Sequence, residues 1–216
     1  AATLTITGTF TIANAITTAT SGGISITSGT LTSTGTITIA TSTTLANAAT
    51  LTKSSATLSL SGSVTGVGTI NIQATATLSL GAVVTISNVL TISGTFTQAS
   101  NAVTFNGNVG FNSATTINAG VSGTGAITVT AVTLTITGPV TIANTITTAT
   151  SGGITVNTGT VTFNNAITIA ASTTLTLNFG IAGTGAVSVA GTLTLGAAAL
   201  TIANALTITG TFTQGS

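Results

Sequence analysis

The feature that most constrains this chain is a strict alternation of side chains, interrupted about every six or seven residues by Gly or Asn. Residues 4–16 read LTITGTFTIANAI: even positions carry the apolar residues together with Gly8 and Asn14, and odd positions carry Thr or Ala. Nearly the same phrase, LTITGPVTIANTI, returns at residues 134–146. A period of two is typical of a strand with one buried face, and Thr, Ile and Val favour strands. We therefore expect many short strands and no helix of any length.

Two longer motifs set the scale of a repeat. The motif T-I-x-N-x-[IL]-T is centred on Asn14, Asn88, Asn144 and Asn204. The motif [VI]-x-G-x-G-x-[IV]-x-[IV] begins at Val64, Val121 and Ile181. The steps between successive copies fit multiples of about 19–20 residues, and a fixed period is the signature of a solenoid. The sequence predicts an all-β, three-faced parallel β-solenoid of about 11 coils of about 19–20 residues, right-handed rather than left-handed, as one elongated domain over residues 1–216 without a linker.

The alternation also assigns side chains to the inside or the outside of the coil. Outward positions are mostly Thr, and the apolar phase predicts a core that includes Leu4, Ile6, Phe10, Ile12, Ile16, Phe96, Ile142 and Phe212. Corners between the faces need a positive φ or a tight bend, and we assign them to Gly8, Asn14, Asn88, Gly94, Asn144, Asn204 and Gly210. Asn in the inward phase is expected to bond the backbone of neighbouring coils as a satisfied polar ladder.

The absence of ionisable side chains excludes most chemistry. Lys53 is the one charged residue, and the chain has no Asp, Glu, His or Cys. General acid–base catalysis and ordinary zinc or calcium sites lack their groups, and one cation does not form a nucleic-acid-binding stripe. No apolar run is long enough for a transmembrane helix. We expect no enzyme activity, no cofactor, no metal, no nucleic-acid partner and no transmembrane segment, with Lys53 exposed in a loop or at an edge.

Two further patterns have competing interpretations. The Gly pairs in GVGTI (66–70), GTGAI (123–127) and GTGAV (183–187) resemble a dinucleotide fingerprint, but that motif needs a helix and an acidic residue, so we interpret them as corners. The Thr-x-Thr pairs resemble in outline the outer faces of insect and microbial ice-binding solenoids. Thr is also simply the polar residue that fits a solvated strand best. Ice binding therefore stands as an alternative function.

The phrases LTI, GTL, GTF, NAIT and SGTGAITV resemble the low-complexity β-helix repeats of large bacterial surface proteins, of the filamentous haemagglutinin and autotransporter passenger type. The resemblance covers essentially the whole chain. It implies a right-handed β-helix, export to the cell surface, and a role as stalk, adhesin or matrix fibre.

The near absence of charge indicates self-association, because charge keeps proteins apart and a neutral surface promotes association. Residues 3–27 resemble 133–157, residues 85–98 resemble 201–214, and neither end of the chain has a polar or helical cap. We expect a structural, self-associating subunit of an extracellular or cell-surface filament or sheath, with an adhesive role left open and no ligand identified. Its expected partner is another copy, stacked end to end or laterally. The alternatives are an ice-binding solenoid and a passive spacer within a giant adhesin.

Overall fold

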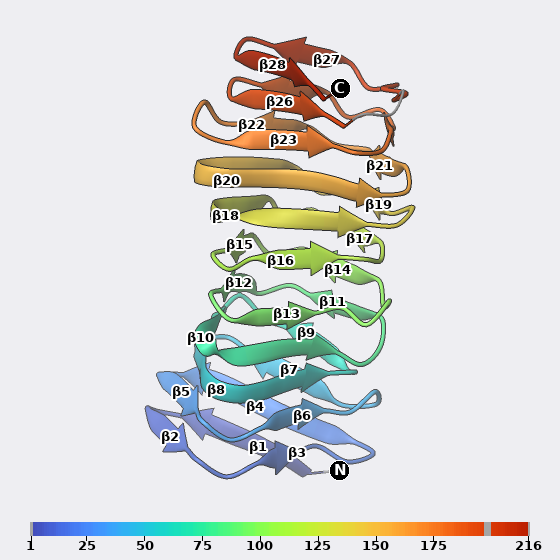
Figure 1. The fold of residues 1–216 in the computed structure, drawn as a ribbon. Helices are drawn as coiled ribbons and strands as arrows, with labels where there is room; N and C mark the ends of the chain where they lie inside the picture. The colour runs from blue at the N-terminus through green and yellow to red at the C-terminus, as the bar shows by residue number, and fades with distance from the viewer. Residues whose placement is uncertain (1, 197–199, 216) are drawn as a thin grey trace. The chain divides into compact units, whose positions relative to one another are not determined.

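Short strands joined by bends wind into a parallel β-solenoid of about ten turns in the computed structural model, which describes residues 2–196 and 200–215 (Figure 1). The described residues contain no helix. Two compact units are formed, Ala1–Val109 and Gly110–Ser216. The all-β solenoid predicted from the alternation is confirmed, with about ten turns instead of about 11. The expectation of one elongated domain stays a prediction.

The first unit has three parallel faces, each visited once per turn. One face contains β1 (Ala2–Thr7), β4 (Gly22–Ser28), β7 (Thr44–Asn47), β9 (Ser63–Thr65), β11 (Val84–Ile86) and β14 (Val103–Phe105). The next contains β2 (Phe10–Ile12), β5 (Thr30–Ser33), the first halves of β8 (Thr50–Leu60) and β10 (Thr69–Leu80), and β12 (Val89–Ile92). The third contains β3 (Ile16–Thr17), β6 (Ile37–Ile39), the second halves of β8 and β10, and β13 (Thr95–Thr97).

The second unit repeats this plan. One face contains β17 (Val121–Ser122), β19 (Thr141–Ile142), β21 (Val161–Phe163) and β24 (Ile181–Ala182). The next contains the first halves of β18 (Ile127–Thr137) and β20 (Ile146–Thr158), then β22 (Ile167–Ile169), β25 (Val187–Val189) and β27 (Leu206–Ile208). The third contains β16 (Thr115–Ile117), the second halves of β18 and β20, β23 (Thr174–Leu177), β26 (Thr192–Leu195) and β28 (Thr211–Gln214). The remaining strand, β15 (Val109–Phe111), lies where the two units meet in the sequence.

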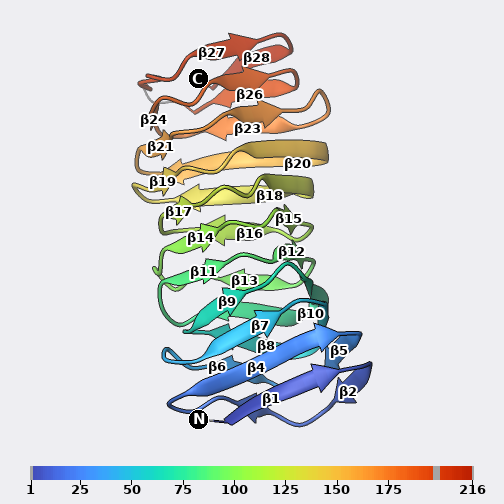
Figure 2. The same cartoon turned by 180° about the vertical axis from the view of Figure 1, so that it is seen from behind.

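Strand pairing gives the length of a turn directly. Leu31 pairs with Leu51, and Leu51 pairs with Ile70, so each step along this face is one turn of the coil. These steps match the period predicted from the motifs, which is therefore confirmed. Within residues 2–109, strands such as β3 and β6 run from left to right in Figure 1, while β1 and β4 on the opposite face run from left to right in Figure 2 as the chain climbs. This sense of winding is right-handed.

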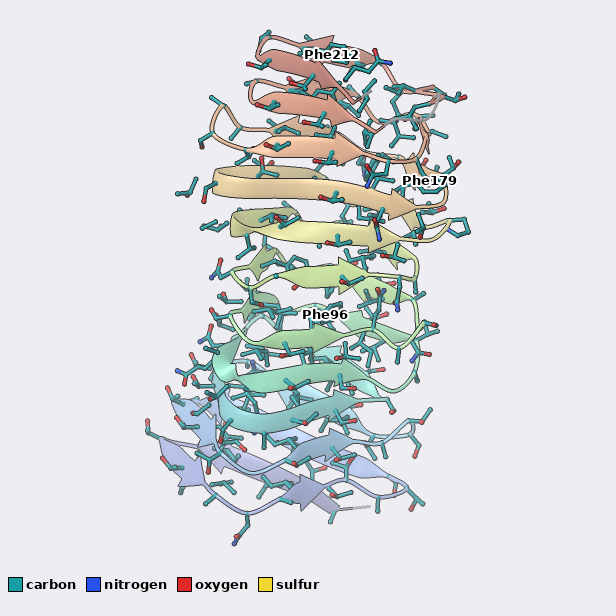
Figure 3. All side chains as sticks on the ribbon, viewed as in Figure 1. Phe96, Phe179 and Phe212 are labelled. Atoms are coloured by element: carbon teal, nitrogen blue, oxygen red, sulfur yellow. The ribbon has the colours of Figure 1, made fainter. Side chains whose placement is uncertain are left out.

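The core consists of Ile, Leu, Val and Phe side chains that stack between turns. Of the side chains predicted to be inside, Ile6, Phe96 and Ile142 are buried, and Ile12 and Ile16 are half-buried. The Phe96 ring (labelled in Figure 3) packs against Phe105 at a centroid distance of 6.4 Å.

Three of the predicted core residues are exposed, so the prediction of burial was wrong for them. Leu4, Phe10 and Phe212 have exposed fractions of 43%, 53% and 52%. They keep the inward phase of the alternation, but they lie in the first and last turns of the structure. An inward side chain is covered by the turns on both sides of its own, and these residues have a neighbouring turn on one side only.

The corners are made in more ways than Gly and Asn alone. At Gly94 and Gly210 the backbone φ is not positive, and both residues lie in bends, the other of the two corner conformations that the sequence allowed. A Cβ at either position would instead collide with the backbone carbonyl of Ala76 or Gly191, because the neighbouring turn passes too closely. The long strands β8, β18 and β20 bend at single residues with positive φ that the sequence did not mark, namely Ala56, Ala131 and Thr150.

An internal duplication is visible in the pairing. Leu4 pairs with Ile24 and Ile24 with Leu45 in the first unit, and Leu134, Ile154 and Leu175 pair in the same way in the second. A three-part hydroxyl network is also duplicated. Thr18 Oγ1 lies 2.5 Å from Thr43 Oγ1 and accepts from Ala40 N, and the same pattern recurs in the second unit at Thr148, Thr173 and Ala170. The similarity of residues 3–27 to 133–157 thus extends in structure to about residues 46 and 176.

We expect the alternation to be testable at two adjacent residues. Ile142→Asp should lower the free energy of unfolding by more than about 3 kcal/mol, because Ile142 is fully buried and the new charge would have no partner. Thr141→Asp, on the exposed outer side of the same strand, should cost less than about 1 kcal/mol. Urea unfolding followed by circular dichroism measures both values, and equal losses would contradict the assigned inside and outside.

Candidate functional site

Outward Thr residues form one continuous column on one face of the second unit, and beside it a second column that is interrupted by the buried Gly153. In the first column each residue pairs with the next one along β18, β20, β23, β26 and β28, and its members are Thr135, Thr155, Thr176, Thr194 and Thr213. The parallel column two residues earlier on each strand is Thr133, Gly153, Thr174, Thr192 and Thr211. We call these ten positions the Thr array. In Figure 1 the five strands lie one above another.

The geometry of a parallel sheet fixes the spacing within the Thr array. Residues i and i+2 of a strand lie about 6.6 Å apart, and neighbouring strands lie about 4.8 Å apart. The array therefore presents hydroxyl and methyl groups on a regular two-dimensional grid. The neighbouring face of this unit has a single outward column, Thr128, Thr147, Thr168, Ser188 and Thr207. The sequence showed the Thr-x-Thr pairs but did not show that five strands align them.

Lys53 lies inside the coil, and the expectation of an exposed loop or edge residue was wrong. Its side chain is completely buried. The reason is its place in the alternation: it follows inward Leu51 by two residues and is stacked between Ser33 of one turn and Ile72 of the next. No charged side chain is therefore exposed among the described residues.

Three backbone carbonyls replace the water that the Lys53 ammonium would otherwise bind. Lys53 Nζ donates to Ser33 O at 3.3 Å and also to Gly35 O and Ser55 O. No carboxylate side chain exists in the chain to neutralise the charge. Burial lowers the pKa of the Lys53 amine below its ordinary value, because the charged form loses hydration. The carbonyl cage satisfies all three donors of the ammonium.

The internal duplication shows what takes the place of this lysine elsewhere in the fold. In the second unit Phe163 corresponds to Ser33. Gly183 lies against Phe163 in the next turn, as Lys53 lies against Ser33. Phe163 is fully buried, and a Cβ on Gly183 would collide with the carbonyl oxygen of Phe163. In the second unit the large side chain of Phe163 is followed one turn later by Gly183, which has no side chain. In the first unit the small side chain of Ser33 is followed one turn later by the long side chain of Lys53. The stem of Lys53 fills core space that Phe163 fills in the second unit, so its role is structural.

The predicted corner Asn residues divide by their place in the coil. Asn88, Asn144 and Asn204 are buried, whereas Asn14, in the first turn, is exposed. Asn88 Nδ2 donates to Asn47 O at 2.7 Å and to Gly68 O at 3.0 Å, in the two preceding turns. The expected bonds from an inward Asn to the backbone of neighbouring turns are therefore present at Asn88. The polar row is not fully satisfied, because the buried Oδ1 of Asn88 has no donor.

The first turn encloses a hollow that is open to solvent. A cavity of about 420 Å³ is lined by residues that include the inward-phase Leu4, Ile16 and Ile24. The polar residues Thr17, Thr18, Thr20 and Ser21 also line it. The lining holds no carboxylate, imidazole, thiol or amine side chain. The cavity is the open end of the coil interior.

The described residues hold no cluster of groups that could bind a metal ion. They also include no helix long and apolar enough to cross a membrane. Comparison with family models, with curated proteins and with solved structures gives no match. The class of protein that the fold defines is therefore a parallel β-solenoid, and its surface features are the Thr array and the open first and last turns.

We expect the pH dependence of stability to arise from Lys53, the only titratable side chain. Between its lowered pKa and the ordinary value of 10.5, the unfolded chain binds a proton that the folded chain has released. The free energy of unfolding should therefore rise with pH between these two pKa values and be nearly flat below both. Chemical unfolding at a series of pH values measures it. Lys53→Met keeps the length of the side chain and should abolish this rise, and a rise that survives in this variant would contradict the assignment.

Proposed function

We propose that the chain is a structural, self-associating β-solenoid that forms or extends a filament or sheath outside the cell or on its surface. The observation that carries the proposal is the uncharged outer surface. Charge keeps proteins apart, and a surface without it promotes association. Because Lys53 is buried, no charged side chain among the described residues opposes close approach of a second copy. The likeness of the repeats to those of bacterial surface proteins favours the extracellular location. An adhesive role would need a ligand that these features do not identify.

We expect residues 1–216 to assemble into filaments at neutral pH, with a layer line near about 4.8 Å along the filament axis. Electron microscopy with image averaging and sedimentation velocity at rising concentration measure this. Assembly should depend little on salt, because no surface charges need screening. A strictly monomeric protein at high concentration would overturn the proposal and favour a passive spacer.

The Thr array favours a second candidate function, the binding of ice. Its regular grid of hydroxyl and methyl groups can order a layer of water on a surface free of charge. Wild-type protein should then show thermal hysteresis and inhibit ice recrystallisation. Thr176→Lys, in the middle of the array, should abolish both activities, whereas Thr168→Lys on the neighbouring face should not. No activity in the wild type at high concentration would end this candidate.

A further inference from the structure

One bend of the first unit holds the dipeptide Asn-Gly, which occurs once in the chain. Asn106 and Gly107 lie in this bend, between β14 and β15. The Asn106 side chain is exposed. The backbone nitrogen of Gly107 is open to approach, because Gly has no Cβ that would hinder it. The bend therefore places an electrophilic side-chain amide next to an unhindered backbone nitrogen.

The packing of the turns requires a glycine at position 107. A Cβ there would lie 2.1 Å from the carbonyl oxygen of Asn88 in the preceding turn. Gly68 and Gly185 end other bends under the same restriction, and a Cβ on either would also lie 2.1 Å from a backbone oxygen. Close contact between turns thus keeps the unhindered nitrogen beside Asn106.

The amide of Gly107 is the most weakly held of these three. Gly68 N and Gly185 N each donate to a carbonyl of the preceding turn at 2.9 Å. Gly107 N lies 3.4 Å from Ile86 O, which also accepts from Asn106 N at 2.9 Å. A hydrogen bond of 3.4 Å is weak beside the usual length of about 2.9–3.0 Å. Little hydrogen bonding is therefore lost when the Gly107 nitrogen turns toward the Asn106 side chain.

The position before each of these glycines faces solvent. Val67 precedes Gly68 and is 88% exposed. Thr184 precedes Gly185 and is also exposed. The fold thus accepts an apolar or a polar side chain at the position that Asn106 occupies in its own bend. A carboxylate formed there would remain hydrated, as exposed charged groups do.

We propose that Asn106 is a site of spontaneous deamidation in the folded protein. Gly107 N loses its proton and attacks Cγ of Asn106, and the new N–Cγ bond closes a succinimide ring. The Cγ–Nδ2 bond breaks, and Nδ2 takes up that proton and leaves as ammonia. Water then opens the ring at either carbonyl and leaves an aspartate or an isoaspartate at position 106. The step needs no oxidant or reductant, and it does not depend on the proposed self-association.

The product gives the outer surface a charge that it otherwise lacks. An aspartate carboxyl has an ordinary pKa of about 3.9 and is ionised at neutral pH. Because Lys53 is buried, this carboxylate would be the only exposed charged side chain among the described residues. The modified chain should therefore run as a more acidic band than the unmodified chain in isoelectric focusing.

Peptide mapping by mass spectrometry tests the inference on the folded protein. The protein is kept at mildly alkaline pH, and circular dichroism verifies that it stays folded. We expect the mass gain of deamidation at Asn106 at least about ten times faster than at Asn108, because the Cβ of Val109 hinders attack there. Asn108 is the matched control, since it is exposed in the same bend. Asn106→Gln, whose longer side chain closes the ring poorly, should fold normally and lose the modification.

Equal rates at Asn106 and Asn108 would overturn the inference. A mass gain at Asn106 that appears in urea but not in the folded protein would also overturn it, because the bend would then protect the amide. Gly107→Ala is not a usable control, since its Cβ would collide with Asn88 O and disturb the packing of the turns.

Hydroxylamine gives a second readout that reports the ring itself. It attacks the succinimide, forms a hydroxamate on residue 106 and releases Gly107 as a new amino terminus. Fragments 1–106 and 107–216 are expected from the folded wild type and not from Asn106→Gln. A mass gain at Asn106 without these fragments would overturn the route through the Gly107 nitrogen.

Discussion

The parallel ladder of backbone hydrogen bonds between turns is the interaction on which the rest of the structure depends. A single turn with three short strands cannot satisfy its own backbone groups or bury its inward side chains. Both needs are met only by the turns on either side, so a turn is stable as part of a stack. The exposed Leu4, Phe10 and Phe212 show this dependence, because they have the right phase and lack a neighbouring turn.

The inward column tolerates exchange as long as volume is conserved between neighbouring turns. The pair Ser33 and Lys53 occupies positions that Phe163 and Gly183 occupy in the second unit, and in both cases one long or large side chain fills the space of two positions. A buried ammonium without a carboxylate is costly, and the carbonyls of Gly35 and Ser55 offset part of that cost. The corner between faces is where free carbonyls are available, which explains how the only charge of the chain can lie inside the coil.

The sequence predicted what is periodic and missed what depends on the stack. Alternation and motif spacing were sufficient for the strands, the three faces and the period, because these follow from local pattern. The bends at Ala56, Ala131 and Thr150 could not be predicted, since neither Ala nor Thr favours a positive φ and the neighbouring turns impose it. The alternation placed Lys53 in the inward phase and so indicated its burial. The prediction of an exposed Lys53 followed instead from the general preference of Lys for water. The Thr array required the register between strands, which single strands do not contain.

The same physical features allow both candidate functions, and the faces on which they act differ. Lateral surfaces of the second unit carry the Thr array, whose hydroxyls are solvated and whose strands are paired on both sides up to β28, so this face has little reason to bind protein. A surface without charge removes the usual electrostatic barrier to the approach of a second copy. The same absence of exposed charge lets the Thr array present its hydroxyl and methyl groups to water without neighbouring ions, so both candidate functions depend on the burial of Lys53.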